Sequence, residues 1–426
     1  MEKTYGHEIK LCRLNEERLF APTFKPNIVL YNNLYNRDCR EYAKYLKSCG
    51  VKIAILPTEG ITFSQDQTTL FSHADLDIKF IDAYFCWNRI MEEMLTKLNV
   101  LSKSQIKKVG SLRFDFYTSR LRPLLKDKEY FQEKYGLEKG RKNIFLATNF
   151  ANAEFCQNLD FLTKELKTQK ATTLVSYEDP KALAEYEYRY RETVFDTLEQ
   201  IAKNNTNINL LIKQHPSESE QTYSNLIERL NQYDANAVLI KAEYIWDVLN
   251  ISDVVIQRCS TVAIEAWLFG KPTIELEYFN AAKHFLRPIY KDGSFIAKRP
   301  EDCVSILRDY MDQAELRIDA NLANARDRLL ADVLEDPKGE TGPILAREIN
   351  RVIEGSSFPT KIKFENLQTA AKALARTLFG QKGYVILTNL YKGRLKDYLG
   401  RFDKNYSKFD EETWLENIRE LMAENY

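Results

Sequence analysis

The sequence predicts an α/β protein with two domains, each built around a parallel β-sheet. Apolar runs of strand length alternate along the chain with segments of helical pattern. Within these runs polar and apolar residues do not alternate, which is typical of parallel strands covered by helices on both faces. The 426 residues are enough for about two or three domains.

The composition argues against several classes of protein. Because 61 basic residues balance 61 acidic ones, the charge does not indicate a general nucleic-acid-binding protein. The seven cysteines have no Cys-x-x-Cys spacing, which indicates reduced thiols in a cytoplasmic protein. We find no apolar run of about 18 residues that would span a membrane and no signal-peptide core at the N-terminus. The four histidines lack metal-ligand spacing, so no structural zinc site is expected. We expect no bound metal, and no cofactor besides the substrates.

The first domain is predicted to comprise residues 1–135. Helical patterns lie near 37–48 and before Leu98, and strands are expected at 8–12, 27–31, 51–56, 79–86 and, as a short strand with its turn, 107–115. The run at 51–56 stops at the polar turn Pro57-Thr58-Glu59-Gly60. In parallel sheets ligands bind just past such carboxyl ends, so this turn is a candidate site.

The second domain is predicted to comprise residues 142–355, after a charged helical link over 118–142. We expect its strands at 143–148, within 208–216, at 237–240, within 252–261 and at 273–277. We expect its helices near 180–204, 217–232, 244–249, 262–269, 300–317 and 341–355. Residues 361–426 are predicted to form C-terminal helices that partly cross back to the first domain.

Two turns of the second domain carry the clearest chemistry. His215-Pro216 follows one strand, and Ser260-Thr261 follows another where a helix begins. Ser and Thr are good N-cap residues, and the amides and dipole at a helix start attract an anion such as phosphate. An imidazole at a strand end can donate to a phosphate oxygen or supply a proton. An ordinary helix cap and a loop hydrogen bond would look the same in sequence.

Five motifs occur along the chain in a set order. They are Thr58-Glu59-Gly60, Val109-Gly-Ser-Leu-Arg-Phe-Asp115, Ala147-Thr-Asn-Phe150, Lys213-Gln-His-Pro216, and Ser260-Thr261 with Glu265-Ala266 and Gly270-Lys-Pro-Thr-Ile274. With these motifs the chain resembles GT-B glycosyltransferases over about residues 25–350. More narrowly, it resembles bacterial capsule and lipopolysaccharide biosynthesis proteins, relatives of the CMP-sugar transferases for sialic acid and Kdo.

The resemblance implies two Rossmann-like domains whose parallel sheets face a cleft. The first domain would bind the acceptor and the second the nucleotide sugar. Such a first domain usually has a strand and a helix before the counterpart of residues 6–12, so we expect an abbreviated N-terminal domain. Thr58 stands where the family has an acidic residue, and this departure bears on the role of Glu59 beside it.

The resemblance also implies roles for single residues. Glu59 would be the general base on the acceptor hydroxyl, and His215 would assist departure of the nucleotide phosphate. Arg113 would bind the acceptor or an acidic sugar, because a guanidinium pairs well with carboxylate or phosphate. The residues implied for the nucleotide and its phosphate are Lys213, His215, Pro216, Arg258, Ser260, Thr261, Asn149 and Glu277, with Glu275 as a second ribose contact. For Arg113, Asn149 and Arg258, a capping or surface role is an equal alternative.

With these roles the sequence predicts a metal-independent glycosyltransferase of surface polysaccharide biosynthesis. Its substrates would be a CMP-linked acidic sugar and a glycan or lipid-linked acceptor, with no nucleic-acid partner. Three alternatives remain: a nucleotide-sugar epimerase, a CDP-glycerol-type phosphotransferase on the same fold, and a non-catalytic binding protein. The protein is expected in the cytoplasm, and at the inner face of the cytoplasmic membrane if the basic and aromatic stretch 382–408 binds lipid.

Overall fold

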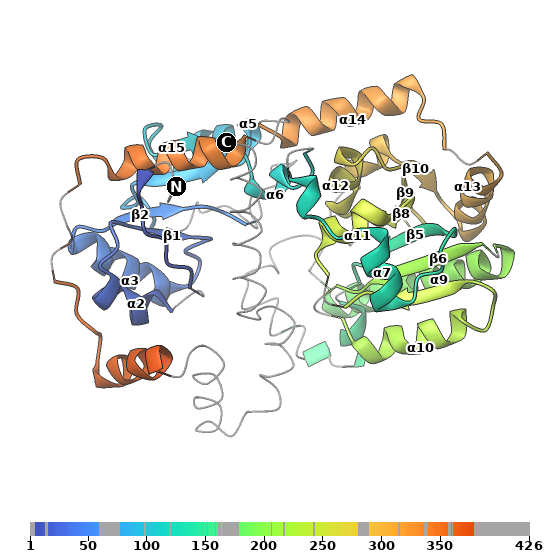
Figure 1. Ribbon diagram of the computed structural model, residues 1–426, viewed down its shortest axis with the longest axis horizontal. Coiled ribbons are helices and arrows are strands. Elements are labelled where there is room, and N and C mark those ends of the chain that lie inside the picture. Colours follow the sequence, from blue (N-terminus) through green and yellow to red (C-terminus); the bar gives the residue numbers. More distant parts are fainter. Residues whose placement is uncertain are drawn as a thin grey trace. The chain divides into compact units, whose positions relative to one another are not determined.

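The computed structural model describes residues 5–12, 16–58, 77–97, 99–118, 121–150, 152–157, 159–160, 163, 179–205, 207–215, 218–241, 243–279, 289–313, 316–335, 340–356, 359 and 361–378. The chain forms two compact units, Met1–Asp115 with Val333–Tyr426, and Phe116–Asp332. Each unit contains one parallel β-sheet with helices on its faces (Figure 1), so the predicted α/β class with two parallel-sheet domains is confirmed.

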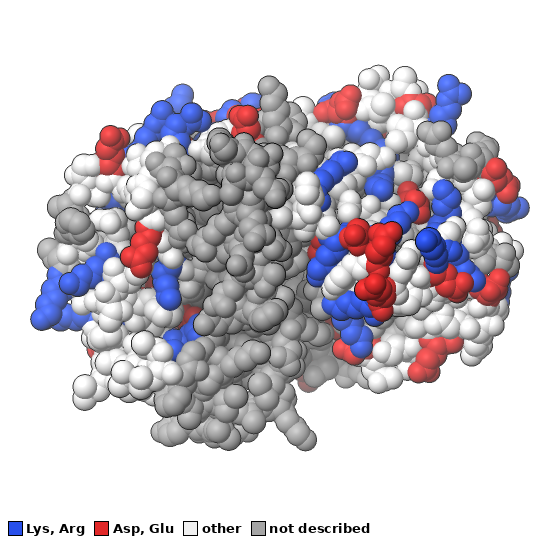
Figure 2. Space-filling view, viewed as in Figure 1, with Lys and Arg blue, Asp and Glu red and all other residues white. Residues whose placement is uncertain are grey.

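Figure 2 shows basic and acidic side chains interspersed over the described residues of one face.

The first unit has a four-stranded sheet in the order β1-β2-β3-β4. Its strands are β1 (Ile28–Tyr31), β2 (Lys52–Ile55), β3 (Ala83–Cys86) and β4 (Ile106–Lys108), and its helices are α2 (Glu17–Phe24), α3 (Arg37–Ser48), α5 (Arg89–Lys97), α6 (Leu112–Asp115) and α15 (Thr341–Ile353). Neighbouring strands run parallel, as crossovers through α3 and α5 require. The strand predicted at 8–12 is wrong, because residues 6–12 form neither helix nor strand.

Successive side chains of β2 belong to two different apolar layers. Ile53 and Ile55 pack with Leu46 of α3 in one core cluster, whereas Ala54 packs in another cluster with Leu345 of α15. Successive side chains of a strand point to opposite faces of the sheet. The sheet of the first unit is therefore covered by α3 on one face and by α15 on the other (Figure 1).

The position of α15 makes the boundary between the units differ from the predicted one. We predicted a boundary at 135–142 and placed α15 in the second domain, but the structure divides the chain after Asp115 and returns α15 to the first unit. The amide of Gly342 donates to Asp115 Oδ2 (2.9 Å), and a Cβ at Gly110 would lie 2.7 Å from Thr341 Oγ1. An amphipathic pattern shows that a helix has an apolar face, but it does not show which sheet that face covers.

The predicted link belongs to the second unit. Its helix α7 (Lys128–Tyr135) and the residues before it are tied to the segment that leads into α11 (Ile245–Ile251). The amide of Lys126 donates to Asp247 Oδ1 (3.0 Å), and the buried carboxyl of Glu243 accepts from Lys126 Nζ (2.5 Å) and Lys134 Nζ (2.6 Å). Burial alone would raise the pKa of Glu243, but the two lysines outweigh it and lower the pKa to about 2.

The second unit has a six-stranded parallel sheet in the order β10-β9-β8-β5-β6-β7. Its strands are β5 (Lys142–Ala147), β6 (Ile208–Lys213), β7 (Asn236–Leu239), β8 (Val254–Gln257), β9 (Thr273–Leu276) and β10 (Phe295–Ala297). The chain runs outward from β5 through β6 to β7, returns to the other side of β5, and runs outward again through β8 and β9 to β10. The strand order therefore reverses between β5 and β8.

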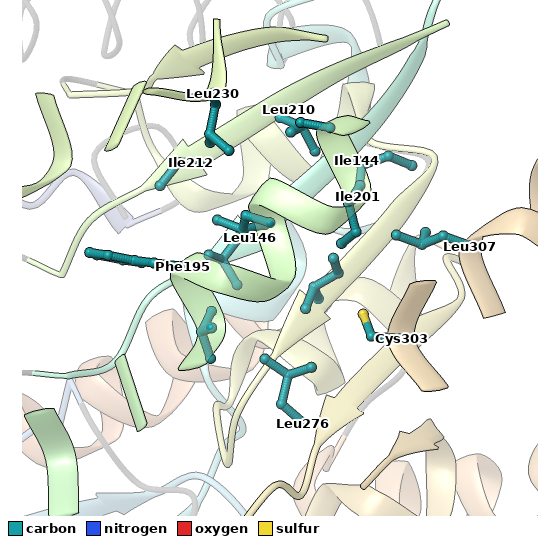
Figure 3. Close-up of a cluster of buried hydrophobic side chains, with 14 of the residues drawn as sticks. Ile144, Leu146, Phe195, Ile201, Leu210, Ile212, Leu230, Leu276, Cys303 and Leu307 are labelled. Atoms are coloured by element: carbon teal, nitrogen blue, oxygen red, sulfur yellow. The ribbon is translucent and has the colours of Figure 1, made fainter. Parts of the chain in front are cut away.

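Helices cover the faces of this second sheet (Figure 1). They are α9 (Pro180–Asn204), α10 (Glu220–Leu230), α11, α12 (Val262–Leu268), α13 (Pro300–Gln313) and α14 (Ala320–Val333), with the 3-10 turns η1 (Arg122–Leu124), η2 (Ala153–Gln157) and η5 (Ile289–Gly293). Phe195 and Ile201 of α9 pack in one cluster with Ile144 of β5 and Ile212 of β6 (Figure 3). The helix begins after Asp179, whose side chain accepts two helix amides at 3.0 Å, as an N-cap does.

Candidate functional site

The candidate site lies on the second unit, where three adjacent strands end. Strand β5 is hydrogen-bonded to β6 on one side and to β8 on the other, so the turns 148–150, 214–215 and 258–261 follow neighbouring carboxyl ends. We call these three turns the carboxyl edge. Open parallel sheets bind ligands where the strand order reverses, as it does between β5 and β8. Asn149, His215 and the Ser260-Thr261 pair thus lie at one edge of one sheet.

A buried carboxyl group ties the first two turns together. The amide of His215 donates to Thr148 Oγ1 (2.8 Å) and to Glu218 Oε2 (3.2 Å). The hydroxyl of Thr148 in turn donates to Glu218 Oε2 (2.5 Å), and the amide of Phe150 donates to Glu218 Oε1. Sequence reasoning missed Glu218, whose signal is only an acidic residue in the Ser-Glu-Ser-Glu run at 217–220.

Arg258 is held in a buried ion pair behind the carboxyl edge. Its Nη2 donates to both carboxyl oxygens of Glu187 (2.8 and 2.9 Å) and to the carbonyl of Asn149 (3.0 Å). Its guanidinium also lies over the rings of Phe150 and Tyr190. Although burial alone would lower it, the pKa of Arg258 is raised because Glu187 stabilises the charge. We predicted that Arg258 contacts a phosphate; in the structure its charge is paired with Glu187, and it holds the backbone of Asn149.

The third turn of the carboxyl edge has a strained backbone. Cys259 has a φ of 46°, a left-handed conformation that costs a residue other than glycine about 1–3 kcal/mol. Its amide donates to Glu275 Oε1 (2.8 Å), and the amide of Ser260 donates to Gln257 Oε1 (2.8 Å). These two amides are engaged by side chains of the same unit. The amides of Ala263 and Ile264 donate to the carbonyls of Ser260 and Thr261 (both 3.1 Å). The groups proposed for an anion at this turn are therefore the hydroxyls of Ser260 and Thr261.

The two hydroxyls of this turn differ in their contacts. Ser260 Oγ accepts from the amide of Val262 at 3.3 Å, which is a weak capping bond. Thr261 is the N-cap residue of α12, yet within the described part of the chain its side chain caps no amide. Both residues are half-buried. The hydroxyl of Ser260 therefore has a partial structural role as a helix cap, whereas the hydroxyl of Thr261 has no capping role among the described residues.

Glu275 lies beneath this turn. Its carboxyl is fully buried, and its oxygens accept from the amide of Cys259 and from Gln257 Nε2. The ribose contact predicted for Glu275 is wrong for this reason. Burial raises the pKa of Glu275 to about 7 and also raises the pKa of the Cys259 thiol. Cys259 is therefore a packing residue and not a thiolate nucleophile at neutral pH.

Lys213 and Glu277 lie at the ends of the strands that flank these turns. Lys213 is the last residue of β6, and burial lowers the pKa of its ammonium group, against the opposing effect of Glu243 and Asp247. Glu277 follows β9 and pairs with Lys291 Nζ at 3.3 Å. Both predicted residues are half-buried, and each lies at the carboxyl end of a strand of the same sheet.

The other predicted site residues lie elsewhere. Glu59 and Pro216 lie outside the described residues. Arg113 is a half-buried residue of α6 in the first unit, where it follows the end of β4. Just after the end of β2, the carbonyl of Pro57 accepts a hydrogen bond from Trp87 Nε1 (2.8 Å). This bond fixes the backbone of Pro57.

Three general features of the described part of the chain bear on chemistry. No group of three or more His, Cys, Asp and Glu side chains in it could hold a metal ion. None of its helices is both long and apolar enough to cross a lipid bilayer. All seven cysteines are free thiols.

A family model matches much of the sequence. The family described as CDP-glycerol:poly(glycerophosphate) glycerophosphotransferase matches residues 46–292, which is more than half of the 426 residues. The matched range includes all three turns of the carboxyl edge. A comparison with curated proteins found no match.

Several solved structures are similar to this chain at low sequence identity. The UDP-GlcNAc 2-epimerase from Neisseria meningitidis is 12% identical, with 79% of this chain and 80% of that chain covered and a TM-score of 0.47. A glycosyltransferase from Rickettsia africae is 12% identical, with 82% and 85% covered and a TM-score of 0.40. The wall teichoic acid polymerase TagF is 16% identical, with 70% and 64% covered and a TM-score of 0.39, so this chain spans less than two thirds of that one. At these TM-scores the likenesses carry no functional conclusion.

Proposed function

The chain belongs to the CDP-glycerol:poly(glycerophosphate) glycerophosphotransferase family, and we propose that it transfers glycerol phosphate from CDP-glycerol to a cell-surface polymer. The family match carries this proposal, because it spans the carboxyl edge, where an open parallel sheet binds its ligand. Membership places the chain among transferases. A CDP-glycerol-type reaction was one of the alternatives that the sequence left open.

The proposed reaction releases CMP. A hydroxyl oxygen of the acceptor attacks the phosphorus that carries the glycerol, and the bond between this phosphorus and the CMP oxygen breaks. The electron pair of that bond leaves with CMP, while the acceptor hydroxyl loses its proton to a general base, for which the sequence favours Glu59. Negative charge develops on the departing phosphate, so fixed donors around it supply the largest stabilisation.

In this proposal the carboxyl edge holds the departing nucleotide. The imidazole of His215 donates to the phosphate or protonates it. The hydroxyls of Ser260 and Thr261 donate to the same phosphate. Asn149 lies in the turn that follows β5, the strand between β6 and β8. Glu277, past the end of β9, would meet the ribose. The three turns belong to one sheet, so their spacing is set by β5, β6 and β8 and not by loop motion.

A second donor class shares the same leaving group. The motifs that resemble CMP-sugar transferases favour a CMP-linked acidic sugar, from which CMP also departs. In that case the acceptor attacks the anomeric carbon, and Arg113 would pair with the carboxylate of the sugar. Because CMP leaves in both reactions, a site for CMP at the carboxyl edge suits either donor, and only an assay separates them.

Product release from a panel of donors tests the proposal. CDP-glycerol, CMP-sialic acid, CMP-Kdo and UDP-N-acetylglucosamine are each incubated with the full chain and a glycerol phosphate-primed acceptor. We expect acceptor-dependent CMP release from CDP-glycerol, unchanged in EDTA because a metal-independent reaction is proposed. CMP release from a CMP-sugar alone would identify the second donor class. Conversion of UDP-N-acetylglucosamine without acceptor would identify an epimerase, and no turnover of any donor would point to a binding protein.

We also propose that the protein works at the inner face of the cytoplasmic membrane, where a lipid-linked acceptor would lie. Residues 367–378 are helical, and one side of this helix contacts the start of α2, where Arg376 lies 3.9 Å from Glu16. The other side exposes three leucines: Leu367 (90%), Leu374 (60%) and Leu378 (66%). An exposed apolar stripe is typical of a helix that lies on a membrane, and the basic, aromatic stretch 382–408 follows in the sequence.

A further inference from the structure

The carboxyl group of Glu218 holds the backbone of two turns of the carboxyl edge, and the proposed reaction gives it no role of its own. The residue is 5% exposed. Its oxygens accept from Thr148 Oγ1, from the amide of Phe150 and from the amide of His215. Thr148 and Phe150 follow β5, His215 follows β6, and Glu218 itself precedes α10. One carboxyl group therefore joins three segments of the chain.

We propose that Glu218 is a positioning residue that sets the place of His215 relative to Asn149, and thereby the affinity of the carboxyl edge for a nucleotide phosphate. This inference rests on the proposed function, which assigns His215 to the phosphate. The amide of His215 donates to Thr148 Oγ1 (2.8 Å) and to Glu218 Oε2 (3.2 Å). Its carbonyl accepts from the amide of Glu218 (2.9 Å). Glu218 thus holds both backbone polar groups of the residue that bears the imidazole.

The backbone of Asn149 is fixed from two sides. Its neighbours Thr148 and Phe150 are bound by Glu218. Its own carbonyl accepts from Arg258 Nη2 (3.0 Å), and the same nitrogen donates to Glu187. Two buried carboxyl groups therefore hold this turn, Glu218 directly and Glu187 through Arg258. The side chains of Asn149 and His215 start from backbone positions that are fixed relative to each other.

A purely structural role for Glu218 makes a different prediction from a positioning role. If the carboxyl only satisfied loop amides, its replacement would lower stability and would affect ligand binding equally whether or not His215 is present. If it positions His215, its effect on binding should disappear when the imidazole is removed, because binding groups must be held within about 0.5 Å of their working geometry. A double-mutant cycle measures this dependence.

The experiment measures the affinity of the full chain for CMP by titration calorimetry. The proteins are the wild type, Glu218→Gln, His215→Ala and the double variant. Glutamine keeps the shape of the side chain but offers one acceptor oxygen, so the amide of Phe150 or of His215 loses its acceptor. We expect Glu218→Gln alone to weaken CMP binding roughly tenfold. In the His215→Ala background, the same change should alter the affinity less than about twofold.

Two further variants make the result specific. Glu154→Gln is the matched control. Among the described residues, Glu154 Oε1 accepts from Arg191 (2.8 Å), from Thr222 (3.3 Å) and, at 3.5 Å, from the amide of Ser219, but not from His215 or the β5 turn. This variant should leave CMP affinity unchanged. Thr148→Val removes the hydroxyl between His215 and Glu218 and keeps the branched shape. Thr148→Val replaces Glu218→Gln in the double-mutant cycle if Glu218→Gln does not fold. It should weaken CMP binding only when His215 is present.

The outcomes separate this inference from the proposed function. Equal weakening by Glu218→Gln with and without His215 overturns the positioning role, and so does a folded Glu218→Gln protein with wild-type affinity. If the wild type does not bind CMP, or if His215→Ala binds it as well as the wild type, the proposed use of the carboxyl edge fails and the inference falls with it.

Discussion

Glu187 and Arg258 form a buried ion pair at 2.8 Å, with side chains 1% and 4% exposed. The two residues are 71 positions apart in the sequence, and their pair joins the long helix α9 to the turn that follows β8. Removing one partner of a buried pair leaves an uncompensated charge, which costs far more than the pair itself contributes. The turn 258–261 should therefore depend on a helix that begins far from it in the sequence.

We expect Glu187→Ala to lower the free energy of unfolding by about 3–5 kcal/mol. Denaturant unfolding followed by circular dichroism measures this loss. The double variant Glu187→Leu with Arg258→Met should recover most of it, because apolar residues of similar size can replace a buried ion pair. An exposed ion pair contributes less than about 1 kcal/mol. If Glu187→Ala lowers the free energy of unfolding by less than this, the pair is not buried in the folded protein.

Ser260 and Thr261 allow helix capping and phosphate binding to be measured separately. Since the Thr261 side chain caps no described amide, Thr261→Val should change the free energy of unfolding by less than about 0.5 kcal/mol and should weaken CMP binding. Ser260→Ala removes the acceptor of the Val262 amide. It should therefore lower the free energy of unfolding by about 0.5–2 kcal/mol and should also weaken CMP binding. Thermal unfolding with and without CMP reports both effects. An unchanged CMP-induced shift in Thr261→Val would indicate an ordinary helix start.

Glu275 should make the protein less stable as the pH rises. Burial raises its pKa from the ordinary value of 4.5 to about 7. Between these two values the folded state binds more protons than the unfolded state, so stability is greatest below pH 4.5 and is lost as the pH rises through 7. The loss from this group is on the order of 3 kcal/mol. Asp247, whose pKa burial raises to about 6, contributes in the same direction.

Denaturant unfolding of the wild type and of Glu275→Gln between pH 5 and 8 tests this sign. Glutamine does not ionise, so the stability of the variant relative to the wild type should increase over this range. The variant also loses one acceptor for Cys259 or Gln257, which lowers its stability by a constant amount at every pH. Parallel pH curves for the two proteins would show that Glu275 is already ionised in the folded state at pH 5.

The exposed leucines of residues 367–378 should bind the protein to anionic vesicles. Each leucine buried in lipid contributes about 1.5–3 kcal/mol. Replacing Leu367, Leu374 and Leu378 with serine should therefore reduce co-sedimentation with phosphatidylglycerol vesicles by more than tenfold. Ile296→Ser is the control, because this residue of β10 is also exposed (38%) and lies in the second unit. Wild-type sedimentation of the triple variant would exclude this stripe as the membrane contact.

The sequence predicted the strands and turns of the carboxyl edge because their signals are local. An apolar run that stops at His215 or at Ser260 shows where a strand ends, and the ends of neighbouring parallel strands meet. It did not predict Glu218, which contacts Thr148 across 70 positions, or Glu187, which contacts Arg258 across 71. In a single sequence, a buried glutamate near or within a helix has the same pattern as an exposed one.

Because α15 covers the sheet of the first unit, that unit finishes folding only after the second has been synthesised. The sheet face that α15 covers includes Ala54 and Phe85, and all of the second unit lies between β4 and α15 in the chain. At about 5–20 residues per second on the ribosome, this face waits roughly 10–45 s for its helix. The strands that are made first are thus packed last, and the nascent chain carries an open apolar surface that a chaperone could bind during that interval.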